Sequence, residues 1–310
     1  LWHSEWDGLP TASVLEKLDP YLVLVRERYG KAPQPSTEKV GTLSKEWAER
    51  LGLKENIVIS GSSFDAHAGA VGAGIAEKTF VCTMGTSCVD MFVEKAENLK
   101  GKNIQSYCGQ AENSILPGYV GVETGQAAFG DIFAWFKRLL EWPLNQLSQI
   151  RESDISEELY IKVKDQILLM LQEEAERLPD EPFPVALDWF NGRRYPNTDD
   201  AQKSAIVGLS LGMDAPYLYR SLVFGAVCGL YRLIEGFEKQ QINIEKIIAV
   251  GGISKKSPYV MQMLSDLSNR EICILDSDQT CAQGAAMYAA VAAGIYENLE
   301  TAAGHMAAKC

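Results

Sequence analysis

The sequence predicts an α/β fold in which a mixed sheet is flanked by helices. Three observations favour it: strand pairs typical of hairpins come first, strand–helix units follow, and glycine-rich turns interrupt them at Gly85, Gly130 and Gly251-Gly252. A chain of 310 residues can bury a large core and predicts one large domain or two.

Composition and charge narrow the classes of function. The chain is 46% hydrophobic and 23% charged, which is ordinary for a globular protein. Its net charge of −12 argues against nucleic acid and anionic membranes as partners, because both attract basic surfaces. A phosphorylated ligand remains compatible, since backbone N–H groups and a metal ion can neutralise phosphates locally. We recognise no signal peptide and no bilayer-spanning apolar run, so we expect no membrane partner.

The cysteines and histidines predict neither disulfides nor zinc. Seven cysteines, an odd number without any CxxC pair, and three scattered histidines do not form a recognisable metal pattern. Most of the cysteines lie in apolar surroundings and are interpreted as buried thiols of a reducing compartment. We therefore expect a cytoplasmic location.

The pattern of residues 1–56 predicts short helices joined by loops. This segment is too small to bury a hydrophobic core by itself. Because the chain starts at Leu1, we expect it to be a piece of something longer. An apolar strand at 57–60 then turns at 61–63 into a helix of Ala, Gly and Val headed by Asp65. Backbone N–H groups at a helix start hold a carboxylate ionised, so Asp65 is either a helix cap or a catalytic base.

A hairpin follows, with strands at 79–84 and 88–93 joined by Gly85, Thr86 and Ser87. Glycine and hydroxyls suit a tight turn, and they also suit a phosphate that needs close backbone approach. A second strand pair is predicted near 106–109 and 119–123, and a helix begins near Gly130. Glu123 ends its strand and is either a cleft residue or a solvated turn acid.

Residues 141–180 predict an amphipathic helix with a solvated charged face. A short strand at 185 leads into a loop that contains Arg193 and Arg194. Three interpretations of these arginines remain open: contact with a phosphate, contact with a partner domain, or exposure to solvent. Residues 216–241 predict a long helix with small residues for close packing.

The last part of the chain contains two strand–helix units. The strand at 246–250 runs into Gly251-Gly252, with Pro258 near the start of a helix, an arrangement suited to a nucleotide's phosphates or ribose. It matches neither the Walker A loop nor G-x-G-x-x-G. A strand at 271–275 and a small-residue helix at 281–293 complete the prediction.

Taken together and in order, these motifs resemble the FGGY family of carbohydrate kinases, and within it the bacterial L-ribulokinases. The family-wide cues are the turn and helix around Asp65, Met84-Gly-Thr-Ser-Cys, Gly121-Val-Glu-Thr-Gly-Gln and Gly251-Gly-Ile-Ser-Lys-Lys. The ribulokinase-like cues are Leu1-Trp-His, Gly8-Leu-Pro, Cys108-Gly-Gln, Leu187-Asp-Trp-Phe-Asn-Gly-Arg-Arg and Ser277-Asp-Gln-Thr-Cys-Ala-Gln-Gly-Ala-Ala.

The resemblance implies an actin-like ATPase (ribonuclease H-like) fold, with ATP and sugar bound between two domains. It divides the chain into residues 1–75, a remnant of the N-terminal sugar-binding domain, and residues 76–310, the C-terminal ATP-binding domain. Most of the N-terminal domain and a tail after Cys310 would then be missing.

The implied activity is phosphorylation of L-ribulose at its 5-hydroxyl with ATP and Mg²⁺. Asp65 matches the family's general base and Glu123 a sugar contact. The nucleotide contacts implied are Gly85, Thr86, Gly130, Gly251, Gly252, Ser254 and Lys256, and no metal ligand is assigned. Glycerol-type members of the family have an asparagine near Lys256, where this sequence has lysine.

Two alternatives remain beside L-ribulose kinase activity. One is another pentulose or polyol kinase of the family, and the other is a non-catalytic nucleotide-binding module of the same fold. We expect the present chain to be inactive alone because half of the cleft is missing. The oligomeric state is open, with a homo-oligomer among the options.

Overall fold

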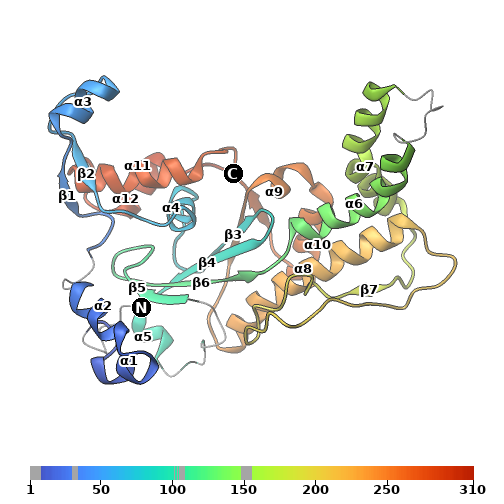
Figure 1. Ribbon diagram of the computed structural model, residues 1–310, viewed down its shortest axis with the longest axis horizontal. Coiled ribbons are helices and arrows are strands. Elements are labelled where there is room, and N and C mark those ends of the chain that lie inside the picture. The colour runs from blue at the N-terminus through green and yellow to red at the C-terminus, as the bar shows by residue number, and fades with distance from the viewer. Residues whose placement is uncertain (1–7, 30–33, 101, 103, 105–108, 148–155) are drawn as a thin grey trace.

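The computed structural model describes residues 8–29, 34–100, 102, 104, 109–147 and 156–310. Its centre is a six-stranded mixed sheet in the order β10-β9-β3-β4-β6-β5 (Figure 1). The strands are β3 (Thr79–Met84), β4 (Cys88–Glu94), β5 (Gly109–Glu112), β6 (Val120–Gln126), β9 (Lys246–Val250) and β10 (Ile272–Ile274). The predicted fold class, a mixed sheet flanked by helices, is confirmed.

The sheet is mixed because hairpins and crossovers both contribute to it. β4 pairs antiparallel with β3 and β6, and β5 pairs antiparallel with β6. β9 runs parallel to β3 on one side and to β10 on the other. Parallel strands require long connections, supplied here by helices. The predicted hairpin at 79–93 is therefore correct, whereas β5 starts later than the strand predicted at 106–109, most of which lies outside the described residues.

Helices cover both faces of this sheet. Alternate residues of β3 point to opposite sides, so Phe80 joins one core cluster and Val81 the other. The Phe80 face packs against α8 (Ala215–Lys239) and α10 (Pro258–Ser268). The Val81 face packs against α4 (Asp65–Gly72), α11 (Thr280–Ala292) and α12 (Leu299–Met306). The last of these helices was not predicted.

The crossing of α4 and α11 depends on small residues. A Cβ placed on Gly72 would overlap the Thr280 carbonyl, and one on Gly284 would overlap the Ala68 carbonyl. The two backbones can meet this closely because both sequences are rich in Ala and Gly. α4 thus shares a core with elements beyond residue 75, and the domain boundary at that residue stays a prediction.

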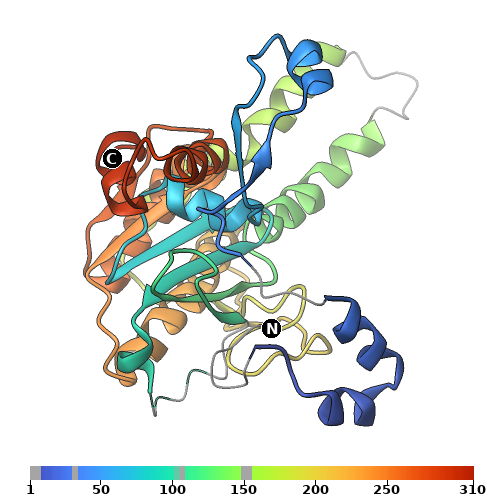
Figure 2. The same cartoon turned by 90° about the vertical axis from the view of Figure 1, so that its left-hand side faces the viewer.

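The N-terminal elements bury little. α1 (Ala12–Leu18) and α2 (Tyr21–Tyr29) contain no buried residue, as expected for a segment without its own core. β1 (Lys39–Thr42) and β2 (Val58–Ser60) form a separate two-stranded ribbon. α3 (Lys45–Leu51) lies at the tip of this ribbon, away from the sheet (Figures 1 and 2). The strand predicted at 57–60 is confirmed, whereas its partner β1 lies in a part of the chain for which we predicted only helices and loops.

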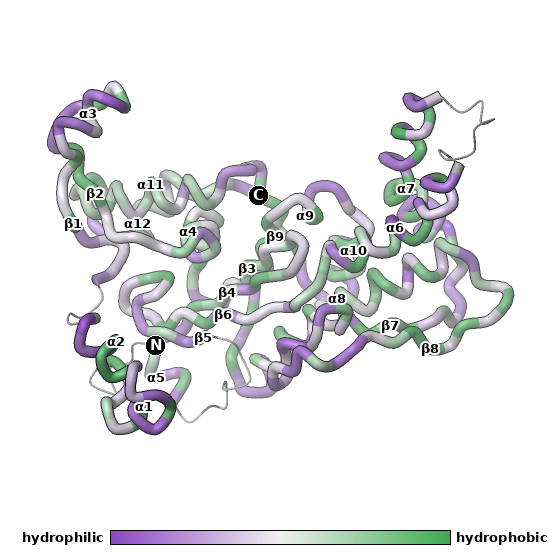
Figure 3. Tube along the Cα trace, viewed as in Figure 1, coloured by the Kyte–Doolittle hydropathy of each residue, from purple (hydrophilic) through white to green (hydrophobic). Residues whose placement is uncertain are grey.

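Two long helices and a second strand pair lie at the end of the molecule opposite the β1–β2 ribbon (Figure 1). α6 (Gly130–Leu147) and α7 (Glu157–Arg177) project from it, and β7 (Val185–Ala186) pairs with β8 (Ile206–Val207) (Figure 1). The short helices α5 (Ala96–Leu99) and α9 (Gly252–Lys256) follow β4 and β9. Hydrophilic residues predominate on α3, whereas α11 is mainly neutral to hydrophobic (Figure 3). No helix among the described residues is long and apolar enough to cross a membrane.

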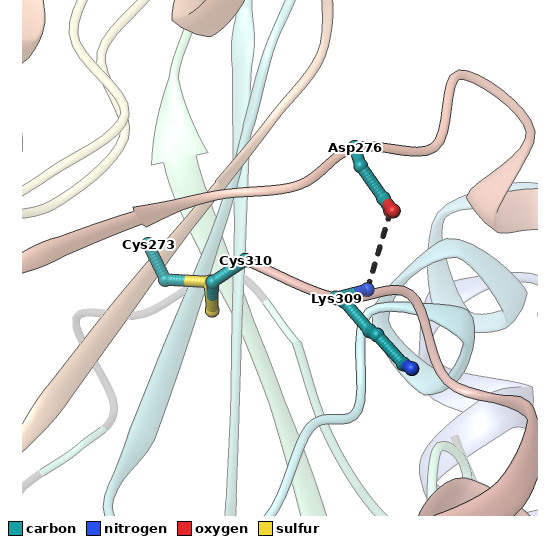
Figure 4. The surroundings of a disulfide bond; sticks show 4 residues. All are labelled: Cys273, Asp276, Lys309 and Cys310. Carbon is teal, nitrogen blue, oxygen red and sulfur yellow. Dashed lines mark hydrogen bonds between the residues drawn. A yellow bond between two sulfur atoms is a disulfide. The ribbon is translucent and has the colours of Figure 1, made fainter.

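The expectation that the cysteines are buried thiols is wrong for one pair. Cys273 and Cys310 form a disulfide (Figure 4). They meet because the end of the chain runs beside β10, where Asp276 N–H donates to the Lys309 carbonyl at 2.9 Å. Among the free cysteines, those at 82 and 88 are buried, the one at 228 is partly buried and the one at 281 is exposed. Cys108 lies outside the described residues.

Candidate active site

Asp65 is the first residue of α4, and its side chain is exposed. The N-cap residue is Phe64, which provides no side-chain cap. Asp65 Oδ1 instead accepts a hydrogen bond from the Ala66 N–H at 2.8 Å. Asp65 is therefore not the N-cap that one interpretation suggested, but it still lies in the first turn of α4, at the positive end of the helix dipole.

The turn before Asp65 is held against the segment that precedes β1. Ser36 Oγ donates to the Ser62 carbonyl at 2.8 Å. A Cβ on Gly61 would lie 2.9 Å from the Pro35 carbonyl oxygen, so only glycine allows this approach. The small residues of 61–63 thus fix where α4 starts.

Glu123 on β6 contacts α4 through His67. His67 Nε2 lies 3.4 Å from Glu123 Oε2, and His67 Nδ1 lies 3.1 Å from the Ser114 carbonyl oxygen. The hydrogen bond from His67 lowers the pKa of Glu123, with partial burial opposing it. His67 is buried, and its contact with Glu123 was not predicted from the sequence. Two helical positions separate it from Asp65, so the two side chains leave different faces of α4.

A cavity of about 580 Å³ opens beside the start of α4. Phe64 and His67 line it at the start of α4, and hydroxyl and amide side chains line it from three loop segments, namely residues 34–36, 62–63 and 113–114. Hydroxyl and amide groups suit a polyhydroxylated ligand, because each can donate or accept a hydrogen bond.

The tip of the β3–β4 hairpin packs against the start of α6. The Gly85 carbonyl accepts from the Gly130 N–H at 3.0 Å, and the Thr86 carbonyl accepts from the N–H groups of Phe129 and Asp131 at 2.9 and 3.1 Å. A Cβ on Gly130 would lie 2.5 Å from the Gly85 oxygen. The structure thus brings together three of the residues assigned to the nucleotide.

The Gly251-Gly252 turn lies next to this hairpin. Gly251 has φ +101°, and a Cβ there would lie 2.5 Å from the Met84 carbonyl oxygen. The Ile253 side chain reaches toward Gly130, within 2.7 Å of where a Cβ would stand. Nothing lies within 4 Å of a Cβ on Gly252. The turn is therefore closed on its Gly251 side by the sheet and open on its Gly252 side.

Ser254 and Lys256 differ in their surroundings. Ser254 is 2% exposed, and its hydroxyl donates to the Gly251 carbonyl at 2.8 Å. This hydrogen bond fixes the conformation of the Gly251-Gly252 turn. Lys256 is exposed at the end of α9, whereas the neighbouring Lys255 pairs with Asp278.

The two loop arginines also differ. The Arg193 guanidinium stacks over Trp189, 5.2 Å from the ring centroid, and its Nε donates to the Asn197 carbonyl at 3.2 Å. The Arg194 carbonyl accepts a hydrogen bond from Thr198 Oγ1 at 3.3 Å, whereas its guanidinium makes no hydrogen bond or ion pair with the described residues. The guanidinium charge contributes to lowering the pKa of Glu123. It therefore lies near the candidate site.

A buried acid behind the hairpin was missed from the sequence. Asp90 on β4 is fully buried, and burial raises its pKa to about 7. Cys88 Sγ donates to its Oδ1 at 3.1 Å, while its Oδ2 has no partner among the described residues. An aspartate at an inward-facing position of an apolar strand was the available signal.

The described residues contain no group of three or more His, Cys, Asp and Glu side chains able to hold a metal ion. Magnesium bound with a nucleotide needs only one or two carboxylates besides phosphate oxygens and water. The exposed Asp65 could supply one such carboxylate.

Sequence comparison relates the chain to kinases. Residues 80–293 match the C-terminal domain of the FGGY family of carbohydrate kinases. A ribulokinase of Vibrio parahaemolyticus is 40% identical over 309 residues, covering 99% of this chain and 54% of that protein. A ribulokinase of Geobacillus thermodenitrificans is 34% identical over 312 residues, covering 99% of this chain and 53% of that protein. The chain thus spans about half the length of these relatives.

Solved structures agree on the fold. A xylulose kinase from Rhodospirillum rubrum superposes with a TM-score of 0.70 at 19% identity, covering 90% of this chain and 51% of that one. A glycerol kinase from Plasmodium falciparum, solved with ADP, superposes with a TM-score of 0.67 at 17% identity, covering 89% of this chain and 50% of that one. With a family match over most of its length, the chain belongs to the FGGY family of carbohydrate kinases.

Proposed function

We propose that the whole protein containing this chain transfers the γ-phosphoryl group of ATP to the 5-hydroxyl of L-ribulose. The observation that carries this proposal is the 40% identity with a ribulokinase over 99% of the chain. The exposed carboxylate at the start of α4 provides a group suited to the chemistry.

Asp65 acts as the general base. Its carboxylate accepts the proton of the sugar hydroxyl as the hydroxyl oxygen attacks the γ-phosphorus in line with the leaving ADP. Two features support this role. Asp65 is exposed, so a substrate can reach it, and it lies in the first turn of α4, where the helix dipole attracts the negative charge of a phosphate group beside it.

Glu123 binds sugar hydroxyls. His67 supports this role by keeping the Glu123 carboxylate ionised and fixed in direction through their 3.4 Å contact. An ionised carboxylate is a strong acceptor for hydroxyl donors. The cavity beside α4 provides neighbouring polar groups.

The glycine turns hold the nucleotide. Gly85 and Thr86 approach the β- and γ-phosphates, Gly130 lies beside them, and Gly251 and Gly252 receive the nucleoside. Lys256 lies exposed near this turn, and buried Ser254 acts by holding it. Mg²⁺, when bound with ATP, neutralises phosphate charge. Asp65 or carboxylates outside this chain would help to hold it.

Residues 1–75 would belong to the sugar-binding domain and residues 76–310 to the ATP-binding domain. The apolar side chains left exposed on α1 and α2, among them Leu18 and Leu24, are consistent with a missing partner for the first part. We expect this chain to be inactive alone and the whole protein to work in the cytoplasm. A homo-oligomer remains an option, and we propose neither nucleic acid nor membrane as a partner.

The test uses the full-length protein, with Asp65→Asn compared with wild type on L-ribulose and Mg-ATP. We expect turnover to fall by about 10²–10⁴-fold, the range expected for loss of a general base, with ADP binding unchanged. Near-normal turnover would contradict the assignment of the base.

A panel of pentuloses and pentitols separates the alternatives. Preference for a sugar other than L-ribulose would assign the protein to another branch of the family. Tight ATP binding without phosphorylation of any sugar would indicate a nucleotide-binding module.

A further inference from the structure

The disulfide between Cys273 and Cys310 lies one strand away from the strand that leads into the nucleotide turn. Cys273 is the middle residue of β10 and pairs with Ile248 of β9. β9 ends at Val250, directly before Gly251. The disulfide therefore joins Cys310 to the edge strand beside the one that positions the turn (Figure 4).

The two cysteines of this bond differ in exposure. Cys310 is exposed, whereas Cys273 is only 7% exposed. Redox-sensing cysteines are typically solvent-accessible and lie next to a second cysteine that resolves the first reaction product. In the cytoplasm, where we expect the whole protein to work, disulfides are usually transient and catalytic or redox-sensing. Both observations point to a bond that opens and closes.

A short series of polar contacts links the disulfide to the nucleotide turn. The Asp276 N–H donates to the Lys309 carbonyl at 2.9 Å, and the Lys309 N–H donates to Asp276 Oδ1 at 3.3 Å. The Asp276 carbonyl in turn accepts from Lys255 Nζ at 3.2 Å, and Lys255 also pairs with Asp278. Lys255 belongs to α9, the helix that starts at Gly252.

The disulfide keeps this series of contacts closed. With the bond formed, Lys309 is held beside Asp276, because a cross-link removes the conformations in which the two segments separate. With the bond open, residues 307–310 keep the two hydrogen bonds to Asp276 and one from the Ala308 N–H to the Gly72 carbonyl at 2.9 Å. A partly exposed segment with so few restraints opens locally more often.

We propose that Cys273 and Cys310 form a reversible redox-modification site whose reaction partner is a low-molecular-weight disulfide, and that its oxidation state sets the rigidity of α9. In the oxidised form α9 is held firmly and the turn binds ADP more tightly. In the reduced form α9 is looser. The effect on ADP rests on the proposed nucleotide site, whereas the effect on rigidity does not.

The oxidation balances with glutathione disulfide as the oxidant. The thiolate of Cys310 attacks one sulfur of glutathione disulfide, which forms a mixed disulfide and releases one glutathione thiolate. The thiolate of Cys273 then attacks the Cys310 sulfur and releases the second glutathione. The two cysteines lose two electrons and two protons, and the oxidant becomes two thiols. A dithiol such as dithiothreitol reverses the reaction by the same exchange.

The test is hydrogen–deuterium exchange of the full-length protein without nucleotide, after treatment with glutathione disulfide or with dithiothreitol. Mass spectrometry of peptides shows whether Cys273 and Cys310 are joined. We expect the amides of residues 251–257 to exchange about two- to tenfold faster in the reduced form, the effect of losing one hydrogen bond. Failure of the pair to form the bond, or equal exchange in the two forms, overturns the proposal.

Variants locate the effect. Cys310→Ser should exchange like the reduced protein under both treatments, whereas Cys281→Ser, at an exposed free thiol, should keep the difference. Lys255→Gln removes the contacts to the segment after β10, so the two treatments should give equal exchange. Lys203→Gln removes an equal charge from an exposed position outside these contacts and should keep the difference. A difference that persists in Lys255→Gln overturns the proposed link.

Titration with ADP separates this inference from the proposed function. We expect Kd to be about fivefold higher in the reduced form, the low end of couplings between two sites. Equal Kd values in the two forms overturn the effect on binding. Absence of ADP binding in both forms would contradict the proposed nucleotide site, and the exchange measurement would still decide the redox inference.

Circular dichroism checks that each variant folds. If Cys310→Ser does not fold, Cys273→Ser takes its place, since either substitution removes the bond.

Discussion

His67 Nε2 on α4 and Glu123 Oε2 on β6 lie 3.4 Å apart, which joins the helix that starts at Asp65 to the central sheet. The imidazole is buried, whereas 43% of the Glu123 side chain is exposed. The contact therefore has a fixed inner partner and an outer carboxylate that a ligand can reach.

Replacing His67 by Asn in the full-length protein should weaken sugar binding. Loss of the His67 hydrogen bond removes the largest cause that lowers the pKa of Glu123, so the pKa rises and the carboxylate protonates at higher pH. We expect KM for L-ribulose to increase about tenfold, with the acid limb of kcat/KM moving to higher pH. The measurement is a pH series of initial rates.

His305→Asn is the matched control for His67→Asn, since His305 stacks on Tyr296 in another part of the chain. An acid limb that does not move in His67→Asn would show that Glu123 does not depend on His67.

The two glycines of the nucleotide turn should respond differently to alanine. Gly251→Ala places a methyl group 2.5 Å from the Met84 carbonyl oxygen at a φ of +101°, whereas Gly252→Ala meets nothing within 4 Å. We expect Gly251→Ala to lower the free energy of unfolding by about 1–3 kcal/mol and to weaken ADP binding. Gly252→Ala should keep stability, as measured by urea unfolding. Equal stability of the two variants would contradict this account of the turn.

Asp90 should make stability depend on pH. Its folded pKa of about 7 lies above the unfolded value, so between pH 4 and 7 the folded state binds more protons and stability falls as pH rises. The full shift corresponds to roughly 4 kcal/mol. Asp90→Asn, which stays neutral, should be more stable than wild type at pH 8 and similar at pH 3, below the unfolded pKa of the aspartate.

Urea unfolding of both proteins across this range isolates the contribution of Asp90, because their other carboxyl groups are the same. A constant difference between the two proteins at all pH values would mean that Asp90 does not titrate there.

The disulfide should contribute to stability under oxidising conditions. It joins positions 37 residues apart, and closing a loop of that length restricts the unfolded chain by about 4 kcal/mol in the entropic treatment. We expect Cys273→Ser to lower the thermal midpoint and to abolish its sensitivity to dithiothreitol. Cys281→Ser, at an exposed free thiol, is the control. A wild-type midpoint unaffected by dithiothreitol would argue against the bond.

Much of the fold could be predicted from local patterns. The helix at Asp65, the hairpin around Gly85 and the strand before Gly251 carry signals within ten residues, and each was located correctly. β1 was missed because its short exposed sequence shows no apolar alternation. The disulfide was missed because it depends on where the end of the chain runs in space.

The candidate site likewise has a part that the sequence predicted and a part that depends on how distant segments pack. The glycines near the nucleotide turn were grouped by their motifs, and the structure brings Gly85, Gly130 and Gly251 together. The His67–Glu123 contact joins residues 56 positions apart and has no local sequence signature.

The close crossing of α4 and α11, with Gly72 against Thr280 and Gly284 against Ala68, has a mechanical consequence. Backbones in direct contact leave no room for sliding, so we expect α4 and α11 to move as one unit. The position of the Asp65 carboxylate is then tied to that of α11, although the two helices lie more than 200 residues apart in the sequence.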